Sequence, residues 1–247
     1  METLLLIAII VIIGIIVSVL NSPQFKGRQG EKFVNNKFLS QLDPLNYTIL
    51  TDIMLHNGSD IGTTQIDHVI VSNFGIFCVE TKAYSGWVLG RASDKYWTQS
   101  INYQKYRFYN PLRQNYGHVK TLEKLLAPLN ISVPIYSFIA FPDAEKLKIT
   151  GTNAVGYVRD IVNKIKGYSQ VVLSNEDTEK IINVINQANI VNEDIRKEHT
   201  KRINKLRDAP PQANYRKRYG RRYREDETIF DDNFDSDDDF DDYDDDF

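Results

Sequence analysis

The sequence predicts an α/β protein whose core follows the order α-β-β-β-α-β, between an apolar N-terminal helix and a charged C-terminal tail. Three observations lead to this prediction. Residues 65–82 contain two apolar, β-branched runs joined by a short turn, which is the pattern of a β-hairpin. Residues 28–42 and 111–126 carry apolar side chains at helical spacing on either side of these strands. Residues 225–247 are strongly acidic and fall outside this pattern.

The remaining elements follow in order along the chain. Residues 47–55 predict a strand, and the polar residues 56–60 predict a loop. Asn110 and Pro111 open the second helix, and Pro128 follows its end. Residues 135–141 and 152–157 predict two further strands. The segment that begins at Ser174 caps a long terminal helix. About 170 residues remain for this fold, which is ample for a single hydrophobic core.

Asp67, Glu80 and Lys82 lie at one end of the predicted hairpin. Side chains alternate across a strand, so Glu80 and Lys82 point to the same face. A two-residue loop at Asn73 and Phe74 sets Asp67 opposite Glu80, at roughly 5 Å between Cβ atoms. A four-residue loop would set Asp67 opposite Lys82, whereas a three-residue loop would separate the three side chains unless a bulge restored the register.

Two carboxylates this close repel each other, and burial of either one without a partner is costly. Mg²⁺ or Mn²⁺ removes both problems, because such ions are held by one or two carboxylates and by water and phosphate oxygens. Lys82 can then orient a water molecule or stabilise developing negative charge. The alternative is an ordinary surface ion pair. The apolar residues on both faces of the flanking strands favour the metal site, since a strand buried on both sides rarely carries charge without a chemical reason.

The residues from about Gly27 to Leu126 resemble the nuclease-related domain family, NERD. The matching elements are Gly30-Glu31, Thr64-Gln65-Ile66-Asp67-His68, Gly75-Ile76-Phe77, Glu80-Thr81-Lys82, Gly86-Trp87 and Asn110-Pro111-Leu112-x-Gln114-Asn115-x-x-His118. The family is itself similar to the PD-(D/E)xK nucleases, so the resemblance implies a restriction-endonuclease-like core. It gives Asp67, Glu80 and Lys82 the D…ExK roles and Glu31 the acidic position on the first helix, as a further metal ligand. Ile66 stands where the superfamily has proline.

Asn110, Gln114 and His118 recur every four residues and share one face of the second helix. The pair Gln114 and His118 resembles a Gln-x-x-x-Tyr element of one branch of those nucleases, with histidine in place of tyrosine. Gln114 would hold the attacking water or a phosphate, and His118 would contact nucleic-acid phosphate or assist proton transfer. The alternative is two polar residues on a partly exposed face. His68 and Cys78 are interpreted as packing residues of the core.

Residues 84–109 are rich in aromatic side chains with lysines and arginines between them. Such a pattern suits single-stranded nucleic acid, through base stacking and phosphate contacts. The competing interpretation makes Trp87 and Trp97 core residues of an inserted group of strands. We favour the core interpretation for both tryptophans and leave the exposed tyrosines open.

The segment from Thr3 to Phe25 contains no charged residue, and Leu4 to Leu20 is almost wholly aliphatic. About 20 apolar residues span a bilayer, which predicts a single transmembrane helix. A cleaved signal peptide is the alternative, but the chain begins with Met1-Glu2 and offers no clean cleavage site. The lysines and arginine at positions 26, 28 and 32 then place the following domain in the cytoplasm. A single cysteine is typical of a reducing compartment.

The formal net charge of −3 conceals two opposite segments. Residues 1–224 carry 30 basic against 19 acidic side chains, whereas residues 225–247 carry 14 acidic and no basic ones. This composition predicts disorder in the acidic tail. The basic residues expected to bind nucleic acid or anionic lipid are Arg216, Lys217, Arg218, Arg221, Arg222 and Arg224. The tail either competes with nucleic acid for basic surface, docks onto a protein partner through its terminal phenylalanine, or only keeps the chain soluble.

These observations divide the chain into a transmembrane anchor (1–24), a nuclease-like domain (25–194, best matched over 27–126), a basic helix or linker (195–224) and an acidic disordered tail (225–247). The expected function is a membrane-anchored, cytoplasmic nuclease that hydrolyses DNA (or RNA) with Mg²⁺ or Mn²⁺ on Asp67 and Glu80. The alternative is a tether that binds nucleic acid at the membrane without cleaving it. No small-molecule cofactor is expected.

Overall fold

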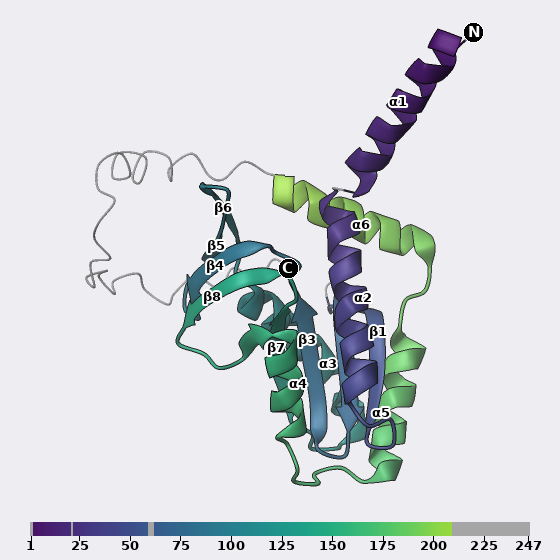
Figure 1. Ribbon diagram of the computed structural model, residues 1–247. Helices are drawn as coiled ribbons and strands as arrows, with labels where there is room; N and C mark the ends of the chain where they lie inside the picture. Colours follow the sequence, from purple (N-terminus) through teal and green to yellow (C-terminus); the bar gives the residue numbers. More distant parts are fainter. Residues whose placement is uncertain (1, 21, 59–61, 209–247) are drawn as a thin grey trace. The chain divides into compact units, whose positions relative to one another are not determined.

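The computed structural model describes residues 2–20, 22–58 and 62–208 (Figure 1). The chain forms two compact units, Met1–Val191 and Asn192–Phe247. The second unit is described over helix α6 (Glu193–Asp208), which contains the start of the predicted basic segment. The basic residues between 216 and 224 and the acidic tail lie outside the described residues.

The first unit is built on a mixed five-stranded sheet. Its strands lie in the order β1 (Tyr47–His56), β2 (Thr63–Ser72), β3 (Gly75–Thr81), β7 (Ile135–Phe141) and β9 (Val155–Tyr157). The first three strands are antiparallel, and β7 and β9 add to them in parallel. Every residue of β3 is buried, because this strand lies at the centre of the sheet and is covered on both faces.

Helices cover both faces of this sheet, as the apolar residues on both sides of the hairpin predicted. Helices α2 (Pro23–Gln41) and α4 (Val158–Lys166) pack against the face that carries Phe77 and Val79. Helices α3 (Pro111–Leu126) and α5 (Asn175–Ala188) pack against the face that carries Val71 and Cys78. Cys78 is a buried core residue, as predicted. His68 is also buried, and its ring packs edge-on against Phe38.

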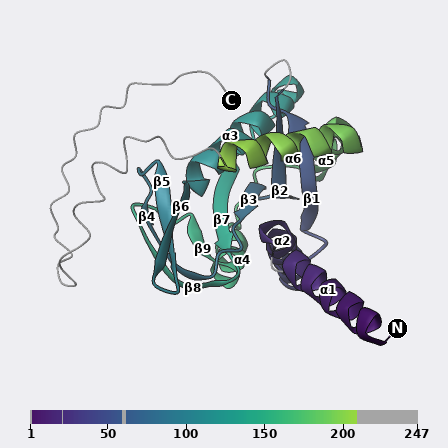
Figure 2. The same cartoon turned by 90° about the horizontal axis from the view of Figure 1, so that it is seen from above.

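A second sheet contains four strands in the order β6 (Gln104–Tyr109), β5 (Tyr96–Ile101), β4 (Gly86–Arg91) and β8 (Ala144–Thr150). Figure 2 shows it beside the β7 and β9 edge of the first sheet. Its inner face shares a core cluster with β7, formed around Val88, Trp97 and Phe141.

The two tryptophans of this sheet have different environments. Trp97 is 0% exposed and confirms the prediction of a core residue, whereas Trp87 is 42% exposed, so the same prediction was wrong for it. The reason is strand alternation: Val88 faces the core, and Trp87 therefore faces outward. Gly90 provides the space for Trp97, since a Cβ atom at Gly90 would lie 2.3 Å from the indole ring.

Local sequence signals fixed most element boundaries. Helix α5 follows the Ser174 cap, whose hydroxyl accepts a hydrogen bond from the Asp177 N–H. Helix α2 begins five residues earlier than predicted, after a similar cap at Ser22. The strand expected at 152–157 is confined to β9, because Gly151 has a φ of +77° and the Thr152 hydroxyl accepts a turn hydrogen bond from Ala154. Strand β8, helix α4 and the short 3₁₀ helix Ala127–Leu129 were not predicted individually.

Helix α1 (Glu2–Leu20) is formed by the apolar N-terminal segment. Within the described ranges, no single helix is both long and apolar enough to cross a membrane. The pair formed by residues Leu5–Leu20 and Phe25–Gln41, bent by 54°, meets that requirement by length and composition when its two helices are taken together.

Candidate active site

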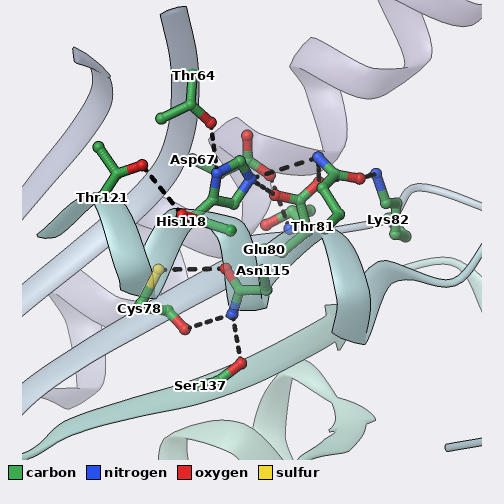
Figure 3. Close-up of polar contacts among 12 residues, drawn as sticks. Thr64, Asp67, Cys78, Glu80, Thr81, Lys82, Asn115, His118, Thr121 and Ser137 are labelled. Carbon is green, nitrogen blue, oxygen red and sulfur yellow. Dashed lines mark hydrogen bonds and ion pairs between the residues drawn. The ribbon is translucent and has the colours of Figure 1, made fainter. Parts of the chain in front are cut away.

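The β2–β3 hairpin brings Asp67 and Glu80 to the same end of the sheet. Ser72 pairs with Gly75 across a two-residue turn, which confirms the shortest of the predicted loops. The ladder runs to the pair His68 and Val79, and the next two residues in this register are Asp67 and Glu80. Asp67 Oδ2 accepts a hydrogen bond from the Thr81 backbone N–H at 2.7 Å, which fixes this carboxylate against β3 (Figure 3).

Glu80, Lys82 and Gln114 form a closed triangle of polar contacts. Lys82 Nζ lies 2.7 Å from Glu80 Oε1 and donates a hydrogen bond to Gln114 Oε1 at 2.8 Å. Gln114 Nε2 donates to Glu80 Oε1, also at 2.8 Å. The amide therefore contacts both members of the ion pair, and helix α3 is joined directly to the end of β3. The structure thus brings together the four residues that the sequence predicted to be catalytic: Asp67, Glu80, Lys82 and Gln114.

His118 contacts Glu80 from the next turn of helix α3 (Figure 3). Its Nε2 lies 3.2 Å from Glu80 Oε2, and its Nδ1 lies 2.7 Å from the Thr64 hydroxyl. The His118 residue is only 4% exposed. Its predicted contact with a phosphate stays a prediction, while in this structure the ring orients the Glu80 carboxylate. Thr64 was not proposed as a site residue, although it belongs to the segment that resembles the family.

Asn115 fixes helix α3 against the sheet and was not identified as important from sequence. Its amide nitrogen donates to Cys78 O at 2.9 Å, to Ser137 Oγ at 2.8 Å and to Phe138 O at 3.3 Å. Its amide oxygen accepts from the Cys78 thiol. The sequence did contain a signal for it, since Asn115 is a polar residue at the helical spacing of the core positions Val119 and Leu122. A fully buried amide at such a position must find hydrogen-bond partners.

Two further carboxylates lie at the rim of the site. Glu31, on helix α2, is half-buried, and burial together with the charges of Glu80 and Asp52 raises its pKa. Asp52 was not anticipated. It has a φ of 55° and interrupts the β1–β2 ladder, and its carboxylate accepts a hydrogen bond from Gln65 Nε2 at 2.7 Å. The backbone irregularity in β1 therefore places an additional acid in the electrostatic field of Glu31.

The two central carboxylates differ in how their charge is compensated. Burial would raise the pKa of Glu80, but Lys82 and His118 outweigh it and lower that pKa to about 2. Burial raises the pKa of Asp67 well above its usual range, and the charges of Glu80 and Glu31 raise it further. Lys82 and the Thr81 N–H offset only part of this effect. Asp67 is therefore the carboxylate whose negative charge lacks a sufficient counter-charge.

The Glu80 carboxylate also determines the protonation of Lys82. Burial would lower the pKa of its ammonium group, but the Glu80 carboxylate outweighs burial and raises that pKa above its usual range. Lys82 thus stays protonated at neutral pH. It can donate hydrogen bonds and stabilise negative charge, and it is not a general base in this state.

Across the part of the chain that the structure describes, no group of three or more histidine, cysteine, aspartate or glutamate side chains is arranged to hold a metal ion. Mg²⁺ requires only one or two protein carboxylates, because water and phosphate oxygens complete its octahedral shell. Asp67 and Glu80 fit that smaller requirement, and the insufficient counter-charge at Asp67 is the feature that a divalent cation would correct.

Comparisons with known proteins agree with the position of the candidate active site in the chain. A family model described as the nuclease-related domain, NERD, matches residues 26–142, a range that contains all six site residues predicted within the folded domain. An uncharacterized protein of Bacillus anthracis is 37% identical over 203 residues, which cover 80% of this chain and 92% of that protein. No solved structure matches the chain.

Proposed function

Because the chain belongs to the nuclease-related domain family, we propose that it is a metal-dependent nuclease that hydrolyses DNA phosphodiester bonds on a restriction-endonuclease-like core. One observation carries the proposal. Asp67, Glu80 and Lys82 converge where the β2–β3 ladder ends, and the Lys82 ammonium lies 2.7 Å from the Glu80 carboxylate. A carboxylate pair can hold a divalent cation, and an adjacent ammonium can stabilise the negative charge that develops during phosphodiester hydrolysis.

Asp67 and Glu80 would hold Mg²⁺ or Mn²⁺, with Glu31 at the edge of the site. The support for this assignment is the charge imbalance, since burial and two neighbouring carboxylates raise the pKa of Asp67. When bound, the ion would supply Lewis-acid polarisation of the phosphodiester.

The chain's own residues would perform the remaining tasks. Lys82 stays protonated, so it would donate a hydrogen bond to the attacking water or to the phosphoryl oxygen on which negative charge develops. Gln114 would hold the Lys82 ammonium and the Glu80 carboxylate in a fixed relative orientation, because its amide contacts both. His118 would restrict the rotation of Glu80 from the opposite side, held in turn by Thr64. These contacts supply preorganisation, which removes the cost of orienting the groups during the reaction.

The proposal includes attachment to a membrane through residues 3–25, with the catalytic domain in the cytoplasm. The apolar composition of helix α1 supports it, and so does the basic character of the residues that follow at positions 26, 28 and 32. A single-pass arrangement would confine hydrolysis to nucleic acid that reaches the membrane surface.

A nucleic-acid tether without catalysis is the second candidate function. The observation that favours it is the contact of Lys82 and His118 with the two oxygens of Glu80. This contact satisfies the Glu80 carboxylate with protein groups, so the fold does not need a cation at that residue. A retained nuclease fold that binds without cleaving would have this property.

The test uses the full chain in detergent micelles, incubated with linear, circular and single-stranded DNA in Mg²⁺, Mn²⁺ or EDTA. We expect cleavage that requires the metal and falls by about 10²–10³ in Lys82→Ala, the usual loss when one charge-stabilising donor is removed. Lys120→Ala is the matched control, because this lysine lies on the exposed face of helix α3 and forms an ion pair with Glu123 there. Binding without cleavage in any metal would favour the tether.

A further inference from the structure

The outer face of the four-stranded sheet carries aromatic and basic side chains together. Trp87 pairs with Ser100 of β5 and with Lys146 of β8, and paired residues share one face of a sheet. The same register places Tyr96 beside Tyr109 on this face. Trp87, Tyr96 and Tyr109 are 42%, 43% and 47% exposed. These three rings form the aromatic part of what we call the outer sheet face.

Cations lie over two of these rings. Lys146 Nζ and Lys148 Nζ lie 4.9 and 4.8 Å from the centroid of the Trp87 ring. The guanidinium carbon of Arg107 lies 5.0 Å from the centroid of the Tyr96 ring. The cations therefore flank the aromatic surfaces at distances typical of cation–π pairs, and both kinds of group face outward together.

The outer sheet face is one-sided in charge. By register the face also includes Lys105, which pairs with Ser100. Strands β4, β5, β6 and β8 are described in full, and the positions of these strands that alternate onto this face contain no aspartate or glutamate. Asp94 lies in the β4–β5 turn, where it accepts a hydrogen bond from the Arg91 N–H. Glu145 lies at the irregularity between the β4 and β8 pairs. The face is therefore a positively charged surface with exposed rings.

We infer that the outer sheet face binds single-stranded nucleic acid, with bases stacked on Trp87 and Tyr96 and phosphates paired with Lys146, Lys148 and Arg107. This inference rests on the proposed function, and it names the form of nucleic acid that the domain engages. Aromatic rings with interleaved cations bind single strands, since each unpaired base offers a ring face and each nucleotide a phosphate. A duplex hides its base faces within the stack, so it can use the cations of this surface and not its rings.

The position of the sheet connects it to the candidate active site. Only residues 83–85 separate Lys82 from strand β4. Within that link, the Tyr84 ring packs at 4.5 Å against Phe108, on the inner face of the same sheet. A single-stranded nucleic acid bound on the outer sheet face is thus held by a sheet whose strand β4 begins four residues after Lys82.

The experiment measures the fluorescence of the full chain in detergent micelles with EDTA, which keeps binding separate from hydrolysis. The chain has two tryptophans, and since Trp97 is fully buried, quenching by a 20-nucleotide oligo-dT reports on Trp87. We expect quenching by oligo-dT, and little by the matched duplex. Trp87→Ala should weaken oligo-dT affinity about tenfold, measured by anisotropy of a labelled oligonucleotide.

Charge variants test the phosphate contacts. Lys146→Glu/Lys148→Glu should weaken oligo-dT binding at least tenfold and reduce its salt dependence. The control double variant, Lys166→Glu/Lys180→Glu, has the same charge change on helices α4 and α5 and should bind within about twofold of the unchanged chain. Equal losses in both double variants would overturn the inference, because binding would then follow net charge alone.

Two further outcomes are decisive. Oligo-dT that binds without changing tryptophan emission would overturn the inference, since the bound strand would not reach Trp87. Emission that responds to removal of residues 225–247 and not to oligo-dT would also overturn it, in favour of the acidic tail as the occupant. If the chain does not cleave DNA but oligo-dT quenches its emission, only the proposed hydrolysis is refuted. If the chain cleaves DNA but oligo-dT does not quench its emission, only this inference is refuted.

Discussion

Gly30 lies where helix α2 meets Ala83, in the segment that follows β3 and begins with Lys82. A Cβ atom at this position would lie 2.6 Å from the Ala83 Cβ and 3.4 Å from Pro142 Cγ. Real Cβ atoms do not approach this closely, so Gly30→Ala must displace the helix or the strand end. Gly27 lies about one turn earlier on the same helix, and a Cβ atom added there would meet no neighbouring group within 4 Å. Gly27→Ala is therefore a matched control.

The expected magnitude follows from two terms. Replacing a helical glycine by alanine stabilises a protein by about 0.5–1 kcal/mol when space is available, and overpacking costs about 1–3 kcal/mol. Gly27→Ala should therefore raise the free energy of unfolding slightly. Gly30→Ala combines the same gain in helix propensity with the cost of overpacking. The difference in unfolding free energy between the two variants therefore equals the steric cost. For a chain of this size that difference corresponds to melting temperatures about 2–12 °C apart.

Thermal unfolding by circular dichroism measures this difference, and DNA cleavage by the same samples measures its effect on the site. Cleavage should fall more in Gly30→Ala, because the displacement separates Glu31, the next residue of the helix, from Lys82. Melting temperatures that agree within about 1 °C would refute the close contact between helix α2 and Ala83. A lower melting temperature for Gly30→Ala with cleavage equal to that of Gly27→Ala would refute the link between this contact and the site.

Two further predictions concern Asn115 and the acidic tail. Asn115→Ala should lower the free energy of unfolding by about 2–4 kcal/mol in denaturant titration, since it removes three hydrogen bonds that a fully buried amide donates to the sheet. Tyr116→Ala, at the exposed next position, should cost less than about 1 kcal/mol, and equal losses would argue against the buried network. Removal of residues 225–247 should raise oligonucleotide affinity at low salt, because 14 negative charges are lost; unchanged affinity would exclude competition by the tail.

The hairpin shows how far local sequence determined the site. Alternation along β2 and β3 and a two-residue turn were sufficient to bring Asp67, Glu80 and Lys82 to one end of one face, as the observed register does. The four-residue spacing on helix α3 likewise placed Gln114 and His118 on a common face. Both conclusions depend only on the period of the local backbone, which is 2 residues in a strand and about 3.6 in a helix.

Long-range pairing decided the features that the sequence did not specify. Strand β8 pairs in parallel with β4 although more than 50 residues separate them, and no local signal marks that partnership. The contact between Thr64 and His118, across 54 residues, depends in the same way on how helix α3 docks onto the sheet. Asp52 became a neighbour of Glu31 through an irregularity in β1 that the sequence pattern did not reveal.

By itself, the sequence determined most of the strands and helices, their caps, the acidic and basic segments, and the set of residues that forms the candidate active site. Only the tertiary structure decided which side of each element is covered. Trp87 and Trp97 illustrate the reason, since alternation and register place them on opposite faces of one sheet. Residues of β7 pack against the face that carries Trp97, whereas Trp87 on the other face is exposed. Burial depends on which distant element packs against a face, and periodicity carries no information about that partner.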